Sequence, residues 1–116
     1  MKKMAIIVSL SWLVIGCVSS EMDLAADGDW YEIGYSDGIK GRTQRSHKVL
    51  SELGHVHQAD YDQGYLAGLD SYCNPDHAYQ IGLSGTYYEG VCEGRDNAQK
   101  FRMEWQRGWD QSSSSN

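Results

Sequence analysis

Three of the four histidines lie near one another in the sequence and could together hold a metal ion. His55 and His57 alternate in a polar stretch, and His47 lies upstream. Neutral imidazole binds zinc, copper or nickel, so these side chains are the main candidates for a metal site. Exposed histidines are also ordinary in a polar connector. We therefore predict no bound metal or cofactor and keep a metal site as the alternative.

Two carboxylate pairs and one serine have residue types that could support hydrolysis. The pairs Asp27/Asp29 and Asp60/Asp62 could act as acid and base, but they lie at predicted helix starts, where acidic residues cap a helix and interact with its dipole. Ser84 in GLSGT resembles a nucleophile elbow that lacks one spacing residue and a preceding strand. We predict no catalytic residue and a non-enzymatic protein, with a hydrolytic enzyme as the weaker alternative.

Aromatic side chains are the clearer candidates for binding. The chain has four tryptophans, eight tyrosines and one phenylalanine. Such residues can form a core, a protein contact or a surface on which a sugar stacks. Four of them fall at the ends of predicted elements or in an irregular segment, and we predict that these reach the surface: Trp30, Tyr87, Tyr88 and Trp109.

The tyrosines recur with glycine in the pattern aromatic-x-x-Gly. Two long copies are offset by 30 residues and consist of Tyr31, Gly34, Tyr35 and Gly38, then Tyr61, Gly64, Tyr65 and Gly68. Each glycine inside a helix costs about 0.5–1 kcal/mol relative to alanine, so some gain must offset it. We predict that the two copies form a close-packed helix pair, in which a neighbouring backbone or ring approaches each glycine and tyrosines fill the space.

Shorter copies of the pattern run from Tyr79 to Gly82 and from Trp105 to Gly108. Because the offset changes from 30 to 44 residues, the pattern indicates one packing device used several times rather than a solenoid. Glycines four residues apart also occur at dimer faces of membrane helices, but charged residues such as Glu32 and Asp62 interrupt both long copies.

Helix signals dominate the rest of the chain. Asp29 and Asn74 are predicted N-caps, and Gly41 is a predicted helix stop. The expected helices are residues 29–40, 45–53, 59–72, 74–82 and 95–109, with an irregular segment over 84–92. The sequence therefore predicts an all-α fold, a small domain of four to five short helices that pack through glycine and tyrosine stripes, with minimal strand content.

The N-terminus has the form of a secretory signal. Lys2 and Lys3 precede twelve apolar residues, which is too short to span a membrane. The stretch from Val14 to Cys17 resembles the lipobox of bacterial lipoproteins, so we expect residues 1–16 to be removed and Cys17 to carry the lipid. Residues 17–28 are then the acylated cysteine and a flexible tether, residues 29–110 the helical domain, and residues 111–116 a disordered serine-rich tail.

Removal of the signal leaves 16 acidic and 8 basic residues, a formal charge of −8. This balance argues against nucleic acid as a partner and against the domain lying flat on an anionic membrane. Val18 and Ser19 follow the cysteine, where aspartate would retain a lipoprotein at the inner membrane. We therefore expect a lipid anchor in the outer membrane, with the domain in the periplasm.

Cys73 and Cys92 remain once Cys17 is assigned to lipid. In an oxidising compartment such a pair normally forms a disulfide, which contributes about 3 kcal/mol for a loop of this length. Free thiols or half of a metal site are the alternatives, although no CxxC spacing is present.

Taken in order, several of these residues resemble the domain of unknown function 2799 family of predicted bacterial lipoproteins. They are Asp29-Trp30, Gly34, Asp37-Gly38 and Gly41, then Tyr61, Gly64, Gly68 and Tyr72-Cys73, then Tyr79, Gly82, Gly85, Tyr88 and Gly90-Val91-Cys92. The resemblance covers residues 29 to 109. It implies a helical periplasmic domain with paired cysteines on a lipid anchor, and it brings no known activity.

The combined prediction is a lipid-anchored envelope protein that binds another envelope protein. A module that binds glycan or peptidoglycan through exposed aromatic residues is the alternative. The sequence identifies neither the partner nor the oligomeric state.

Overall fold

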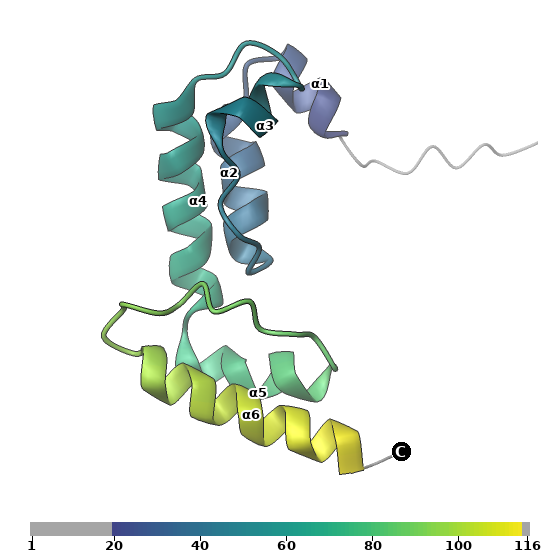
Figure 1. Cartoon of the computed structure of the whole chain (residues 1–116), viewed down its shortest axis with the longest axis vertical. Helices are drawn as coiled ribbons and strands as arrows, with labels where there is room; N and C mark the ends of the chain where they lie inside the picture. The colour runs from purple at the N-terminus through teal and green to yellow at the C-terminus, as the bar shows by residue number, and fades with distance from the viewer. Residues whose placement is uncertain (1–19, 115–116) are drawn as a thin grey trace, which may run out of the picture.

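The computed structural model describes residues 20–114, which form six α-helices and no β-strand (Figure 1). The helices are α1 (Glu21–Ala26), α2 (Trp30–Ile39), α3 (His47–Ser51), α4 (Gln58–Tyr72), α5 (Pro75–Leu83) and α6 (Ala98–Ser114). The all-α prediction is confirmed, with one helix more than expected because α1 lies in the predicted tether.

Four of the helices form two pairs, and each pair is joined by a segment that returns the chain to its starting end (Figure 1). The first pair is α2 and α4, connected by residues 40–57, which include α3. The second pair is α5 and α6, connected by residues 84–97. Because the connection returns each time, both helices of a pair run in the same direction. The second pair lies beyond the C-terminal end of α4, and α1 packs on α2 at the opposite end.

Glycine brings the backbones of α2 and α4 into direct contact. A Cβ atom on Gly34 would lie 2.0 Å from the carbonyl oxygen of Tyr61, and one on Gly64 would lie 2.0 Å from that of Tyr31. In glycine a Cα–H bond takes the place of the Cα–Cβ bond and points at the same carbonyl oxygen. The contact is therefore a Cα–H to carbonyl approach of the kind found between closely packed helices. One turn later the same contact joins Gly38 to Tyr65 and Gly68 to Tyr35, with Cβ-to-oxygen distances of 2.2 and 2.3 Å.

The second pair uses the same contact once. A Cβ atom on Gly82 would lie 2.0 Å from the carbonyl oxygen of Trp105, and one on Gly108 would lie 2.1 Å from that of Tyr79. In both pairs each glycine faces the carbonyl of the aromatic residue three positions before the partner's glycine. Packing through glycine is thus confirmed, whereas the prediction that tyrosine rings fill the space is wrong, because backbone carbonyls occupy it.

The first helices of both pairs end in the same motif. Gly41 and Gly85 have positive φ angles of 68° and 78°. The N–H of the next residue donates to the carbonyl five residues earlier, at 3.0 Å from Arg42 and 3.3 Å from Thr86. This six-residue closure is the Schellman motif, which needs glycine at the left-handed position. Gly41 also leaves room for a ring, because a Cβ there would lie 2.2 Å from Cζ of Tyr72.

The turns after these glycines then bond to the second helices at equivalent positions. The hydroxyl of Tyr65 donates to the carbonyl of Arg42 at 2.7 Å, and Nε1 of Trp105 donates to the carbonyl of Thr86 at 2.9 Å. Tyr65 and Trp105 each lie three residues before the glycine of their helix. The second pair is therefore a structural repeat of the first, which explains why the aromatic-x-x-Gly pattern recurs in the sequence.

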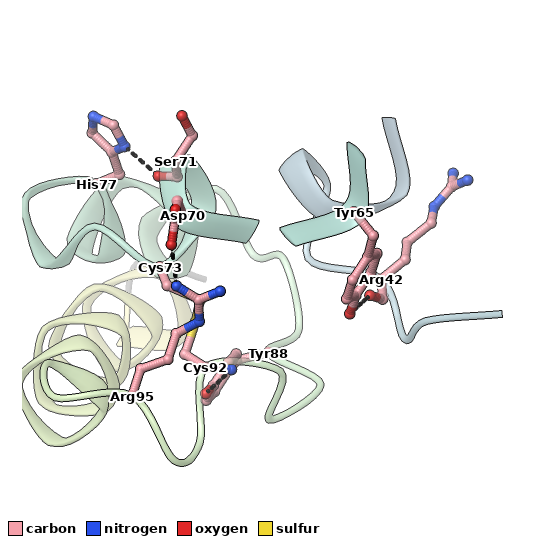
Figure 2. The surroundings of a disulfide bond; sticks show 9 residues. All are labelled: Arg42, Tyr65, Asp70, Ser71, Cys73, His77, Tyr88, Cys92 and Arg95. Carbon is pink, nitrogen blue, oxygen red and sulfur yellow. Dashed lines mark hydrogen bonds and ion pairs between the residues drawn. A yellow bond between two sulfur atoms is a disulfide. The ribbon is translucent and has the colours of Figure 1, made fainter. Parts of the chain in front are cut away.

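A disulfide fixes the junction between the two pairs. Cys73 directly follows α4, Cys92 lies in the connection between α5 and α6, and both are buried. Figure 2 shows Tyr88 folded back towards Cys92, whose N–H donates to the tyrosine hydroxyl at 3.0 Å. The predicted pairing of the two cysteines is confirmed.

The predicted flexible tether is wrong for residues 20–28. Ser20 caps α1, and Ala25 is buried in the core. Glu21 accepts two hydrogen bonds from the guanidinium of Arg45, which hold α1 against the domain. Cys17, together with the whole predicted signal, lies outside the described residues.

The predicted disordered tail is also wrong as far as Ser114, because α6 continues to that residue. The start of α6 is later than expected, since Gly94 has a φ of 87° and residues 91–97 form turns. Asp29 and Asn74 cap α2 and α5 as predicted. Within residues 20–114, none of the helices combines the length and the apolar character needed to cross a membrane.

Candidate functional site

Two of the four aromatic residues predicted at the surface are buried instead. Trp30 is 1% exposed, because α1 and α3 cover the start of α2 and place its indole in one cluster with Ala25 and Leu50. Tyr88 is 8% exposed, and its ring packs on Phe101 at 5.1 Å between centroids. Both residues stabilise the core, so the prediction that they contact a partner at the surface is wrong.

The other two, Tyr87 and Trp109, meet at one surface with Trp105, and we call these three residues the aromatic cluster. Tyr87 is 70% exposed, and both tryptophans are partly buried. The tyrosine ring stands edge-on to Trp105 at 6.3 Å and to Trp109 at 6.5 Å, and the two indoles lie 5.2 Å apart at 32°. The cluster presents a large apolar area whose rings are fixed by one another.

The backbone explains why this cluster is ordered. Trp105 and Trp109 are one turn apart on α6, and the hydrogen bond from Trp105 to Thr86 fixes the first indole. Tyr87 directly follows Thr86, so the same bond holds it over the helix. The sequence predicted Trp105 only as part of a short copy of the aromatic-x-x-Gly packing pattern. Its spacing of four from Trp109 was the signal that the two indoles would share a surface.

The tyrosines of the first pair differ in exposure although their packing is alike. Tyr61 and Tyr65 stack at 6.2 Å and are buried, because residues 41–46 cover them. Tyr31 and Tyr35 stack at 6.4 Å and 14° on the outer side of α2, where Tyr31 is 41% exposed and Tyr35 is half-buried.

A buried carboxylate, Asp37, lies beneath the turn that follows α2, and its longest contact is an ion pair with Arg42 at 3.9 Å. Asp37 is 1% exposed and accepts hydrogen bonds at 2.8 Å from both the hydroxyl of Tyr61 and Nε of Arg45. Arg45 also binds Glu21, and its backbone N–H donates to the Tyr61 hydroxyl at 3.0 Å. The sequence does not predict this network: Arg45 was expected to begin a helix, whereas it lies before α3, where only the folded chain brings it to Asp37.

The pKa shifts in this network favour the protonation states that its hydrogen bonds need. Burial raises the pKa of Tyr61 to about 12, which keeps its hydroxyl protonated as a donor to Asp37. The hydrogen bonds from Arg45 lower the pKa of Glu21, so that carboxylate stays charged. Each group is thus held in the ionisation state that its bonds require.

The candidate catalytic and metal-binding residues lie in separate structural positions. His55 and His57 make an edge contact with ring centroids 5.9 Å apart, while His47 lies in α3. Among residues 20–114, no three histidine, cysteine or acidic side chains gather as metal ligands do. Ser84 caps the C-terminal end of α5, where its hydroxyl donates to Ile81 and bonds Thr86.

The carboxylate pairs also have structural partners. Asp27 ends α1, Asp29 caps α2 and Asp60 lies in the first turn of α4. Asp62 accepts from the side-chain amides of Gln44 and Gln58, at 2.7 and 2.8 Å. Asp29 therefore acts as a helix cap, and Asp62 holds the connection at Gln44 against α4.

Two grooves flank the junction between the helix pairs. A polar groove of about 460 Å³ lies beside Cys73, where Arg95 forms an ion pair with Asp70 (Figure 2). A largely apolar groove of about 380 Å³ is lined by Ile39 and Ile81. Thr86 also lines it and bonds Trp105, so this groove adjoins the aromatic cluster.

Comparisons with known proteins agree with the resemblance seen in the sequence. A family model described as "Protein of unknown function (DUF2799)" matches residues 29–110. An uncharacterised protein of Escherichia coli (strain K12), YfiL, is 32% identical over 111 residues, which cover 90% of this chain and 88% of that protein. No solved structure matches. With its paired glycine helices and its disulfide all inside the matched region, the chain belongs to the DUF2799 family of proteins of unknown function.

Proposed function

We propose that this protein is an outer-membrane lipoprotein without enzymatic activity whose domain binds another envelope protein through the aromatic cluster. The observation that carries the proposal is the 70% exposure of Tyr87 over two partly exposed indoles. Aromatic residues of this kind contribute most of the binding energy at protein interfaces when a partner buries them. Because the rings are already ordered by mutual contact, binding costs less side-chain entropy.

The position of the aromatic cluster supports contact away from the membrane. With Cys17 as the lipidated residue, only Val18 and Ser19 separate it from Ser20, so the Cα atoms of Cys17 and Ser20 can be at most about 11 Å apart. Since α1 begins directly afterwards and is held by Arg45, the α1 end lies next to the membrane. The second pair lies beyond the other end of α4 (Figure 1), so an anchor at Cys17 would leave the aromatic cluster on the side away from the membrane.

The lipid anchor has its own test. Replacing Cys17 with alanine removes the only sulfur that the lipidating enzyme can modify in the stretch from Val14 to Cys17. We expect an unprocessed, unlabelled precursor when cells are grown with a radioactive fatty acid. Continued labelling of the Cys17→Ala variant would disprove the lipoprotein assignment without affecting the binding proposal.

Site-specific crosslinking in living cells tests the partner. A photoreactive amino acid at position 87 should give a reproducible crosslinked band. Mass spectrometry then identifies the partner protein in that band. Lys100 is a matched control, because it is also exposed on the second pair but lies outside the aromatic cluster. Equal bands from positions 87 and 100, or none from either, would count against binding through the cluster.

The two adjacent indoles also favour a second candidate, a glycan-binding module. Sugar rings stack on flat aromatic faces, and the indoles of Trp105 and Trp109 lie side by side at 5.2 Å. Sedimentation of the purified protein with peptidoglycan sacculi separates the candidates. Retention that is lost in Trp109→Ala would favour the glycan, whereas a protein that stays in the supernatant would exclude it.

A further inference from the structure

The structural repeat allows equivalent surfaces of the two helix pairs to be compared. Gly108 faces the carbonyl of Tyr79 at a Cβ-to-oxygen distance of 2.1 Å, and Gly68 faces that of Tyr35 at 2.3 Å. Tyr79 on α5 is therefore equivalent to Tyr35 on α2. The residues directly before the two glycines are Arg107 on α6 and Ala67 on α4.

In the second pair this tyrosine is covered from within the chain. The guanidinium carbon of Arg107 lies 4.0 Å from the centroid of the Tyr79 ring, which is a cation–π contact. Glu104 holds the guanidinium in place through an ion pair of 2.8 Å. The second pair thus supplies both the aromatic face and the cation that occupies it.

In the first pair the corresponding cover is missing. Ala67 ends at Cβ, so the position equivalent to Arg107 carries no cation. Tyr35 stacks on Tyr31 with an interplanar angle of 14°, and together they form what we call the α2 tyrosine face. The two ring centroids lie 6.4 Å apart, and Tyr31 is 41% exposed.

We propose that the α2 tyrosine face binds an arginine side chain from a basic segment of a partner protein. The occupant follows from the repeat, in which arginine covers the equivalent ring, and from the charge of the chain, which is −6. Carboxylates lie close in sequence to the face: Glu32 adjoins Tyr31, and Asp60 lies seven residues before Ala67, on the same side of α4. A planar guanidinium stacks on an aromatic ring and can also bond such carboxylates, which a compact ammonium does less well.

This surface is separate from the aromatic cluster. It lies on α2, in the first pair, whereas the cluster lies on the second pair. The proposal therefore goes beyond the proposed function, and either can fail while the other holds.

NMR of the purified full-length chain, titrated with a tetra-arginine peptide, tests the proposal. We expect the ring signals of Tyr31 and Tyr35 to move, and the affinity to exceed that for tetra-lysine by about two- to five-fold, as a cation–π contact at an exposed site gives. Ring signals that stay fixed, or equal binding of both peptides, would overturn it. Movement with protein concentration in the absence of peptide would instead indicate a second copy of the chain as the occupant.

The decisive variant supplies the missing cover from within the chain. In Ala67→Arg the new guanidinium can lie over Tyr35 as Arg107 lies over Tyr79, so the Tyr35 signals should shift without peptide and tetra-arginine should bind about two- to five-fold more weakly. Tyr35→Leu keeps an apolar side chain and should weaken binding of the peptide by the same factor. Val49→Ala, at a 45% exposed residue on α3, should leave the affinity unchanged. Unaltered affinity in both Ala67→Arg and Tyr35→Leu would refute the site.

Discussion

At the scale of single residues, Asp37 has the most demanding environment in the described part of the chain. A charged carboxylate at 1% exposure is tolerated only where donors compensate its lost hydration. Tyr61 comes from α4, Arg45 from the connection, and Arg45 in turn reaches Glu21 on α1. The glycine contacts already join α2 to α4, and this buried charge adds the connection and α1 to that pair.

Replacing Arg45 with alanine should therefore destabilise the protein by about 3–5 kcal/mol, because it leaves Asp37 buried without its main counter-charge. Urea denaturation followed by circular dichroism measures this. Glu21→Gln is the matched control, since it removes the exposed half of the same network, where the side chain is 45% exposed, and should cost less than about 1 kcal/mol. Similar losses in the two variants would contradict this assignment.

The buried tyrosines predict a loss of stability in alkali. Burial raises the pKa of Tyr72 from 10.0 to about 12. Because the pKa is higher in the folded state, this contribution is complete below pH 10 and is lost as the pH rises from 10 to 12, by about 2–3 kcal/mol for a shift of two units. Burial of the ring is the main cause of this shift, so Tyr72→Phe, which keeps the ring, should change little at pH 7.

Denaturation of the wild type and of Tyr72→Phe at pH 8, 10 and 11.5 checks this prediction. The variant should lose less stability than the wild type between pH 10 and 11.5. Tyr61 titrates in the same range, so part of the fall should persist in the variant. Parallel curves for the two proteins would show that Tyr72 ionises as freely in the folded as in the unfolded state.

At the scale of the helix, glycine determines the separation of the two helices in each pair. Alanine at position 34 would place a methyl group 2.0 Å from a backbone oxygen, and a backbone cannot turn aside as a side chain can. The gain in helix propensity from Gly34→Ala, at most about 1 kcal/mol, opposes a larger cost of forcing the helices apart.

We expect Gly34→Ala and Gly82→Ala each to lose about 2 kcal/mol or more in net stability, with larger losses for leucine. Thermal denaturation with circular dichroism is sufficient to see it. Leu66→Ala provides the control, because Leu66 is 54% exposed on α4 and its loss should cost well under 1 kcal/mol. A Gly34→Ala protein as stable as the wild type would mean that the helices are not in contact at this position.

The same elements show how far the sequence could predict the structure. The spacing of Gly34, Gly38, Gly64 and Gly68 predicted that α2 packs on α4, since both helices carry matching small residues. It could not predict that the paired helices are parallel, because direction depends on the path of the connection. The predicted exposure of Trp30 is wrong for a related reason. A residue at a helix start is buried only if another segment covers it, and the sequence predicts a tether where α1 lies.

At the scale of the whole molecule, the two helix pairs are held together by few contacts. Within the second pair there is one reciprocal glycine contact, whereas the first pair has two. Between the pairs, the ring of Tyr72 on α4 packs on that of Phe101 on α6, with 5.3 Å between centroids. The disulfide from Cys73 to Cys92 therefore contributes disproportionately, because it ties the second pair's connection to the end of α4.

Replacing both cysteines with alanine should cost about 3 kcal/mol, the value expected for a loop of this length. The loss should not be uniform. In native-state hydrogen exchange, amides of α5 and α6 should lose protection first, while those of α2 and α4 stay protected by four glycine contacts and the Asp37 network. If all four helices lose protection equally, the repeats unfold as one cooperative unit and the disulfide stabilises the molecule as a whole rather than its second half.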